Sequence, residues 1–142
     1  MSSLRSQVNL RLQQAANEID ILRAAERPLA QRSAADAAVL FLQLSYRAHL
    51  ADLLQQYQLP ANIHSDARHA VKSLREERDV PELRELARLE EEGPEQLSFL
   101  SHRYLNPQTT AAISSLSSDA LLVSYQWLKG LIERHREVSR EE

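Results

Sequence analysis

The chain of 142 residues contains no cysteine. Without a thiol the protein cannot form a disulfide, bind zinc through thiolates or use a cysteine nucleophile. A chain without cysteine also fits a reducing compartment, so we expect a cytoplasmic protein. Residues 1–14 alternate polar and apolar side chains and have no continuous apolar stretch, so we expect no secretory signal.

Long hydrophobic runs, glycine and a basic excess are also missing. The longest apolar run, residues 37–42, is far shorter than the roughly 20 residues that cross a bilayer. Two glycines are too few for a phosphate-binding loop, and a net charge of −3 gives no electrostatic bias toward nucleic acid. We therefore expect no membrane segment and no nucleotide cofactor.

The residues that are abundant favour helices. Leu, Ala, Gln, Glu and Arg dominate the sequence, and all of them lose little rotamer freedom in a helix. Apolar residues at spacings of three and four predict a first helix over residues 3–26, ended by Pro28. Its predicted core seam consists of Leu4, Val8, Leu12, Ala15, Ile19 and Leu22.

A second, weaker stripe lies on the other side of this first helix. It consists of Leu10, Asn17, Ile21 and Ala24. One interpretation is a partly exposed back face, and the alternative is a seam for self-association into a homodimer.

The next helix is predicted over residues 33–59, with Ser33 as its N-cap and Pro60 beyond its end. Two apolar faces flank a narrow polar strip, so we expect this helix to be the centre of a bundle. One face is Val39, Leu42, Tyr46, Leu50, Leu53 and Tyr57; the other is Ala37, Phe41, Leu44, Ala48 and Ala51.

Shorter helices are predicted over residues 65–79, 81–92 and 94–105, and a final long helix starts at Ser117 or Ser118. Residues 106–117 are rich in Ser and Thr and read as a loop or a single helical turn. Residues 139–142 should fray. These elements predict an all-α fold, namely a single-domain antiparallel bundle of about five to six helices over residues 1–142.

The segment NIHSDARHAVK, residues 62–72, first resembles a metal site. His64 and His69 are five residues apart, however, so on one helix they would point about 140° from each other and could not share a metal. With Ser65 as N-cap, Asp66 would face the positive helix end and the two histidines would pack as a staple. We expect the start of a helix and no bound metal.

The same helix carries a basic edge, which is Arg68, Lys72, Arg75 and Arg78. Such an edge could bind phosphate or nucleic acid. Acidic residues follow at once and no aromatic side chain interleaves, so a solvated charged face is the favoured interpretation.

The polar strip of the central helix brings Ser45, His49 and Asp52 to one side. Buried together they would form a candidate site, whereas a strip that faces water would carry no chemistry. His102 and His135 have no ligand-type neighbour at useful spacing. Because no catalytic motif is found, the sequence predicts no enzyme activity and no cofactor.

Two segments, LSYRAHLADLLQQYQLP (44–60) and ELRELARLEEEGPEQLSFLSHRYL (82–105), resemble in order and spacing a family of short, uncharacterised all-helical gammaproteobacterial proteins. The resemblance spans about residues 3–105. It implies a bacterial, cytoplasmic helical protein and no catalytic residue.

The leading functional prediction is a non-enzymatic interaction or regulatory protein that presents a helix face to itself or to a protein partner. The alternative is a nucleic-acid-associated regulator that uses the basic edge. A metal-dependent bundle enzyme is a third hypothesis.

Overall fold

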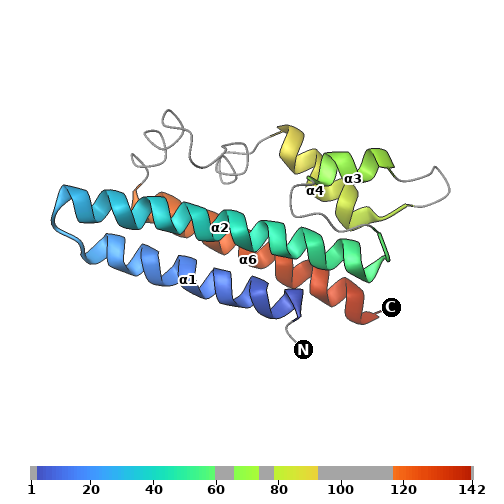
Figure 1. The fold of residues 1–142 in the computed structure, drawn as a ribbon, viewed down its shortest axis with the longest axis horizontal. Helices are drawn as coiled ribbons and strands as arrows, with labels where there is room; N and C mark the ends of the chain where they lie inside the picture. Colours follow the sequence, from blue (N-terminus) through green and yellow to red (C-terminus); the bar gives the residue numbers. More distant parts are fainter. Residues whose placement is uncertain (1–2, 60–65, 74–78, 93–116, 142) are drawn as a thin grey trace.

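A computed structural model describes residues 3–59, 66–73, 79–92 and 117–141 (Figure 1). Every element in these ranges is an α-helix, so the predicted all-α bundle is confirmed. The described helices are α1 (Leu4–Ala24), α2 (Pro28–Gln56), α3 (Ala67–Ser73), α4 (Pro81–Glu92) and α6 (Ser118–Glu141). None of them contains an apolar stretch long enough to cross a bilayer.

Helix α1 follows its predicted pattern. The Ser3 hydroxyl accepts a hydrogen bond from the Ser6 amide at 3.0 Å, which satisfies one of the free donors at the helix start. The predicted seam turns inward, with buried residues Val8, Leu12, Ala15 and Ile19. The helix therefore packs one face on the bundle and leaves the opposite face in solvent.

Helix α2 starts five residues before the predicted N-cap. Pro28 occupies the first turn, where a missing amide hydrogen is tolerated, and Arg27 is the cap residue. Ser33 is an exposed residue inside the helix, so the prediction of a start at Ser33 was wrong. A proline that ends one helix can begin the next, and it does so here.

The helices α1 and α2 form an antiparallel hairpin, and α6 lies alongside both of them (Figure 1). Helix α3 packs on α4, and α4 contacts α2 near the end where the two chain termini lie (Figure 1). The long helix α2 thus contacts α1, α4 and α6, which agrees with the central position predicted for it.

The remaining helix ends bear on three smaller predictions. Helix α3 has Asp66 as its cap, because the Asp66 carboxylate accepts from the His69 amide at 2.7 Å. The assignment of Ser65 as cap was therefore wrong, and Ser65 itself lies outside the described residues. Ser117 caps α6, and α6 continues to Glu141 because its last turns contain no glycine or proline. The predicted fray of residues 139–142 stays a prediction.

The predicted helix 94–105 and the segment 106–116 lie outside the described residues. One hydrophobic core joins all five described helices. Its largest fully buried side chains are Ile19, Leu42, Leu50, Leu53, Leu54, Leu83, Leu86, Leu121, Leu128 and Ile132.

Leu42 of α2 belongs to this core and is 0% exposed, whereas Leu29 of the same helix is 76% exposed. We expect Leu42→Ala to lower the free energy of unfolding by about 2–5 kcal/mol, because it removes buried surface and leaves a cavity. Leu29→Ala is the matched control and should change it by less than about 0.5 kcal/mol. Urea unfolding compares the two; equal effects would contradict the described core.

Candidate functional site

The predicted Ser45, His49 and Asp52 cluster is only partly formed. Ser45 and His49 are buried, but the Ser45 hydroxyl donates to the Phe41 carbonyl at 2.8 Å, within its own helix. Asp52 lies at the solvent side of the strip and accepts from Gln56 at 3.0 Å. The sequence left open whether the three side chains are buried together; Ser45 and His49 are buried, whereas the Asp52 carboxylate stays near water, where an anion is better solvated.

The partners of His49 come from other helices. His49 Nε2 lies 2.9 Å from Nδ1 of His135 on α6, and the two rings stack with centroids 5.1 Å apart. His135 Nε2 lies 3.0 Å from Oε1 of Glu85 on α4. We call Glu85, His135 and His49 the histidine chain, since it links α4, α6 and α2 in one hydrogen-bonded line.

The chemistry of the histidine chain fixes its tautomers when both rings are neutral. A carboxylate only accepts, so His135 must donate to Glu85 from Nε2. His135 Nδ1 then carries the lone pair and accepts from His49 Nε2–H. His49 Nδ1 is left unprotonated and buried, and it has no hydrogen-bond partner within the described ranges.

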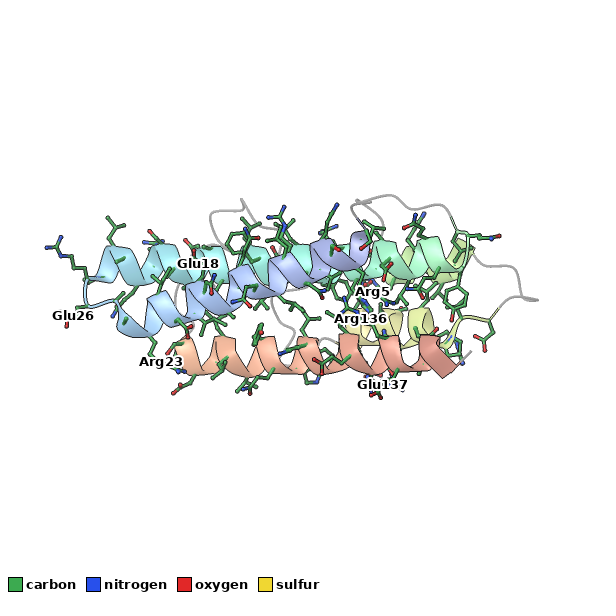
Figure 2. All side chains as sticks on the ribbon, turned by 90° about the horizontal axis from the view of Figure 1, so that it is seen from below. Arg5, Glu18, Arg23, Glu26, Arg136 and Glu137 are labelled. Atoms are coloured by element: carbon green, nitrogen blue, oxygen red, sulfur yellow. The ribbon has the colours of Figure 1, made fainter. Side chains whose placement is uncertain are left out.

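Two positive charges act on His49. Arg5 of α1 and Arg136 of α6 lie toward each other between those helices (Figure 2), and Arg136 donates to the Arg5 carbonyl at 3.4 Å. Burial, His135 and these two guanidinium groups together lower the pKa of His49 to about 3. His49 is therefore neutral in the folded protein at physiological pH.

Two further glutamates of α4 bond to Tyr46 of α2 and to Tyr57, the residue directly after α2. The Tyr57 hydroxyl donates to Glu82 at 2.9 Å, and the Tyr46 hydroxyl donates to Glu90. Glu82 is buried, and the Glu90 side chain is only 7% exposed. Burial, followed by the neighbouring Glu90 charge, raises the pKa of Tyr46 well above 10.0, so Tyr46 remains a donor.

Glu90 also supports α3. Its two carboxylate oxygens accept from the backbone amides of Ala67 and Arg68, at 3.0 and 3.2 Å. These amides belong to the first turn of α3, where a negative charge is stabilised by the helix dipole. Glu90 thus joins α2, α3 and α4 through one carboxylate.

Glu85 and His135 were missed by sequence reasoning, although a signal for His135 was present. The apolar seam of the last helix runs through Leu128 and Ile132, and three residues further it reaches His135, which is buried. A histidine on an apolar seam signals a buried polar partner. Nothing in local spacing indicates that this partner is Glu85, because the contact joins residues 50 apart.

The basic edge is only partly described. Arg68 and Lys72 are exposed, whereas Arg75 and Arg78 lie outside the described residues. Arg68 lies 3.5 Å from Asp66 and 3.6 Å from Glu90, so two carboxylates already offset its charge. These contacts weaken Arg68 as an anion-binding residue.

All four residues of the α1 stripe lie on the solvent-exposed face of the helix. Leu10 is 53% exposed and Ile21 is 52% exposed, and Asn17 and Ala24 are exposed as well. The stripe lies opposite the buried seam of α1, and the Gln13 amide donates to Asn17 at 3.0 Å. The described fold therefore leaves both large side chains of the stripe accessible.

The histidine chain can either hold an additional proton or remain a neutral line of hydrogen bonds. Within the described ranges no three histidine or acidic side chains form a group that could hold a metal ion. Each of the three groups faces the next in the line, and Glu85 also accepts from Arg134.

Comparison with known proteins found no matching family model, no matching curated protein and no matching solved structure. The resemblance of residues 3–105 to a family of short helical proteins therefore stays a prediction.

Because His49 is neutral in the fold, the free energy of unfolding should fall as the pH is lowered. An unfolded histidine has a pKa near 6.5, whereas His49 in the fold has a pKa of about 3, so below pH 6.5 the unfolded chain binds a proton that the native chain does not. This stabilising contribution is present above pH 6.5 and is lost toward pH 3, at about 1.4 kcal/mol per pH unit. Chemical unfolding at a series of pH values measures this loss.

In the same measurement, His49→Gln should remove this part of the acid dependence, because the amide does not titrate. Gln126→Asn, which replaces an exposed residue of α6 that does not titrate, is the control and should leave the dependence unchanged. An unaltered pH slope in His49→Gln would contradict a neutral, buried His49.

The Tyr46–Glu90 hydrogen bond should contribute measurably to the free energy of unfolding. Tyr46→Phe removes the donor to a poorly solvated carboxylate and should lower the free energy of unfolding by about 1–3 kcal/mol. Tyr125→Phe is the matched control, because it keeps the ring beneath Lys129 at 6.0 Å and should have almost no effect. Equal losses for the two substitutions, measured by urea unfolding, would contradict this role of the Tyr46 hydroxyl.

Proposed function

We propose that the protein is a non-enzymatic interaction or regulatory protein that presents the outer face of α1 to a second copy of the chain. The observation that carries this proposal is the exposure of Leu10 and Ile21, each more than half accessible on one side of one helix. Single exposed apolar residues are common, but two aligned on a rigid helix make a patch that association would cover.

The spacing of the stripe suits a two-fold axis. Leu10 and Ile21 are separated by three helical turns, about 16 Å along the axis. In an antiparallel pair of α1 helices centred between them, Leu10 of each copy lies against Ile21 of the other. Asn17 would then lie close to the partner's Gln14, a pairing of two amides. Such an isologous contact is the commonest way in which soluble chains form dimers.

The buried seam of α1 supports this use of the outer face. Val8, Leu12, Ala15 and Ile19 anchor the helix in the core, so its opposite face is held in a fixed shape. A pre-ordered face binds with little loss of conformational entropy. The bacterial cytoplasm is the compartment that we propose, on the grounds of the cysteine-free sequence and the family resemblance.

The nucleic-acid alternative has no comparable support, since Arg68 already lies near Asp66 and Glu90. It stays a prediction about the basic edge.

Self-association should respond to charge on the stripe. We expect sedimentation velocity across a concentration series to show a monomer–dimer equilibrium in the original chain. Leu10→Glu or Ile21→Glu should shift it to monomer, because a carboxylate would be buried without a partner. Val123→Glu, on α6 at a residue 50% exposed, is the matched control and should leave the equilibrium unchanged. A strict monomer at all concentrations would overturn the proposal.

A further inference from the structure

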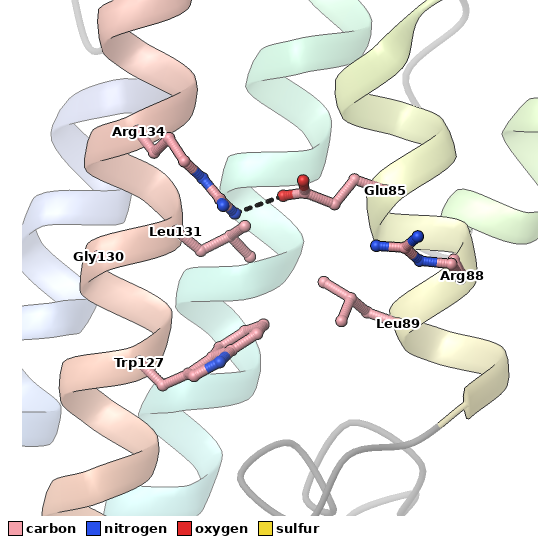
Figure 3. A pocket seen from close by; sticks show the side chains of 7 residues that line it. All are labelled: Glu85, Arg88, Leu89, Trp127, Gly130, Leu131 and Arg134. Atoms are coloured by element: carbon pink, nitrogen blue, oxygen red, sulfur yellow. Dashed lines mark hydrogen bonds and ion pairs between the residues drawn. The ribbon is translucent and has the colours of Figure 1, made fainter.

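A pocket of about 340 Å³ lies between α4 and α6, beside the outer end of the histidine chain (Figure 3). Its α4 side is formed by Glu85, Arg88 and Leu89. This volume is at the lower end of the range of small-ligand sites, enough for a compact organic molecule of one or two rings.

The α6 side of the pocket is formed in part by a flat aromatic ring and in part by a residue without a side chain. Trp127 turns its indole toward α4, and Leu131 lies beside it (Figure 3). Between Trp127 and Arg134 the helix carries Gly130, and a Cβ added there would meet nothing within 4 Å. Packing therefore does not require glycine, although in a helix interior it costs about 1 kcal/mol relative to alanine. Its missing side chain keeps the pocket open.

The charges in the pocket do not cancel. Arg88 and Arg134 contribute +2 and Glu85 contributes −1, which leaves +1. Arg134 bonds to Glu85 at 2.6 Å, but its side chain is 59% exposed and keeps donors for a second partner. Arg88 is exposed, and its guanidinium extends from α4 toward the space between the helices (Figure 3).

We propose that this pocket binds a small aromatic carboxylate. Two guanidinium groups match the planar geometry of a carboxylate, and one negative charge balances the +1 of the pocket. The indole of Trp127 and the side chains of Leu89 and Leu131 contact the flat apolar body of the ligand. This site is independent of the α1 stripe and of the proposed self-association.

Benzoate is the probe, and Trp127 is the reporter because it is the only tryptophan in the chain. We expect a saturable change in intrinsic fluorescence on adding benzoate. Benzamide has the same shape without the charge and should bind at least about tenfold more weakly. Acetate has the charge without the ring and should also bind more weakly than benzoate. Higher salt should weaken benzoate binding.

Substitutions around the pocket test its location, and two of them should change the affinity for benzoate in opposite directions. Arg88→Gln should weaken benzoate binding about tenfold. Arg84→Gln, also exposed on α4 but paired with Asp79 at 2.7 Å, is the matched control and should bind as the original chain does. Glu85→Gln should tighten binding, because it removes the competitor for Arg134 and raises the pocket charge to +2.

Gly130→Leu keeps both arginines in the chain but fills the pocket, so it should abolish binding. Gly130→Ala should raise the melting temperature. Thermal unfolding of each variant separates lost binding from lost fold. The proposal is overturned if benzoate gives no saturable signal, if benzamide binds equally well, or if folded Arg88→Gln binds as tightly as Arg84→Gln.

Discussion

The structure depends on satisfying the polar groups that α4 buries where it meets the rest of the bundle. A buried carboxylate without donors would cost several kcal/mol, so each one needs a partner of the right chemistry at the right place. Glu82 and Glu90 accept from tyrosine hydroxyls, and Glu85 accepts from His135 and Arg134. Apolar contacts through Leu83 and Leu86 hold the same helix in the core.

This requirement restricts how α4 can sit. Apolar side chains tolerate small shifts of one helix along another. A buried carboxylate that moves away from its donor, however, has neither that hydrogen bond nor the hydration that it lost on folding. The three glutamates lie along α4 and contact α2 and α6, so a displacement along the helix would break them together. The neutral state of His49 has the same origin, because burial and the nearby Arg5 and Arg136 oppose a further positive charge.

Helix periodicity predicted much of the fold. The buried seam of α1, the central position of α2 and the start of α4 at Pro81 are set by residues close in sequence, which is why their spacing was informative. Capping was less predictable. Arg27, followed by Pro28 in the first turn, and Asp66 took the cap positions assigned to Ser33 and Ser65, because several residues in each segment were compatible with a helix start.

The candidate site was harder to predict, because its partners are distant in the chain. His49 was recognised as a residue of interest from the polar strip, yet the strip itself assigned it the wrong carboxylate. Its partner His135 is 86 residues away, and Glu85 follows through a second long-range contact. Only the packing of α4 and α6 onto α2 brings these groups together, and local spacing does not contain that information.

The protonation state of the His49 imidazole tests this description of the buried contact most directly. Nitrogen-15 NMR of histidine side chains reports which ring nitrogen carries the proton, and a pH series reports when the ring becomes charged. We expect His49 to carry its proton at Nε2 while His135 is neutral, and to remain uncharged as the pH is lowered well below 6.5, toward about 3. A His49 ring that becomes charged near pH 6.5, or that carries its proton at Nδ1 while His135 is neutral, would contradict the histidine chain.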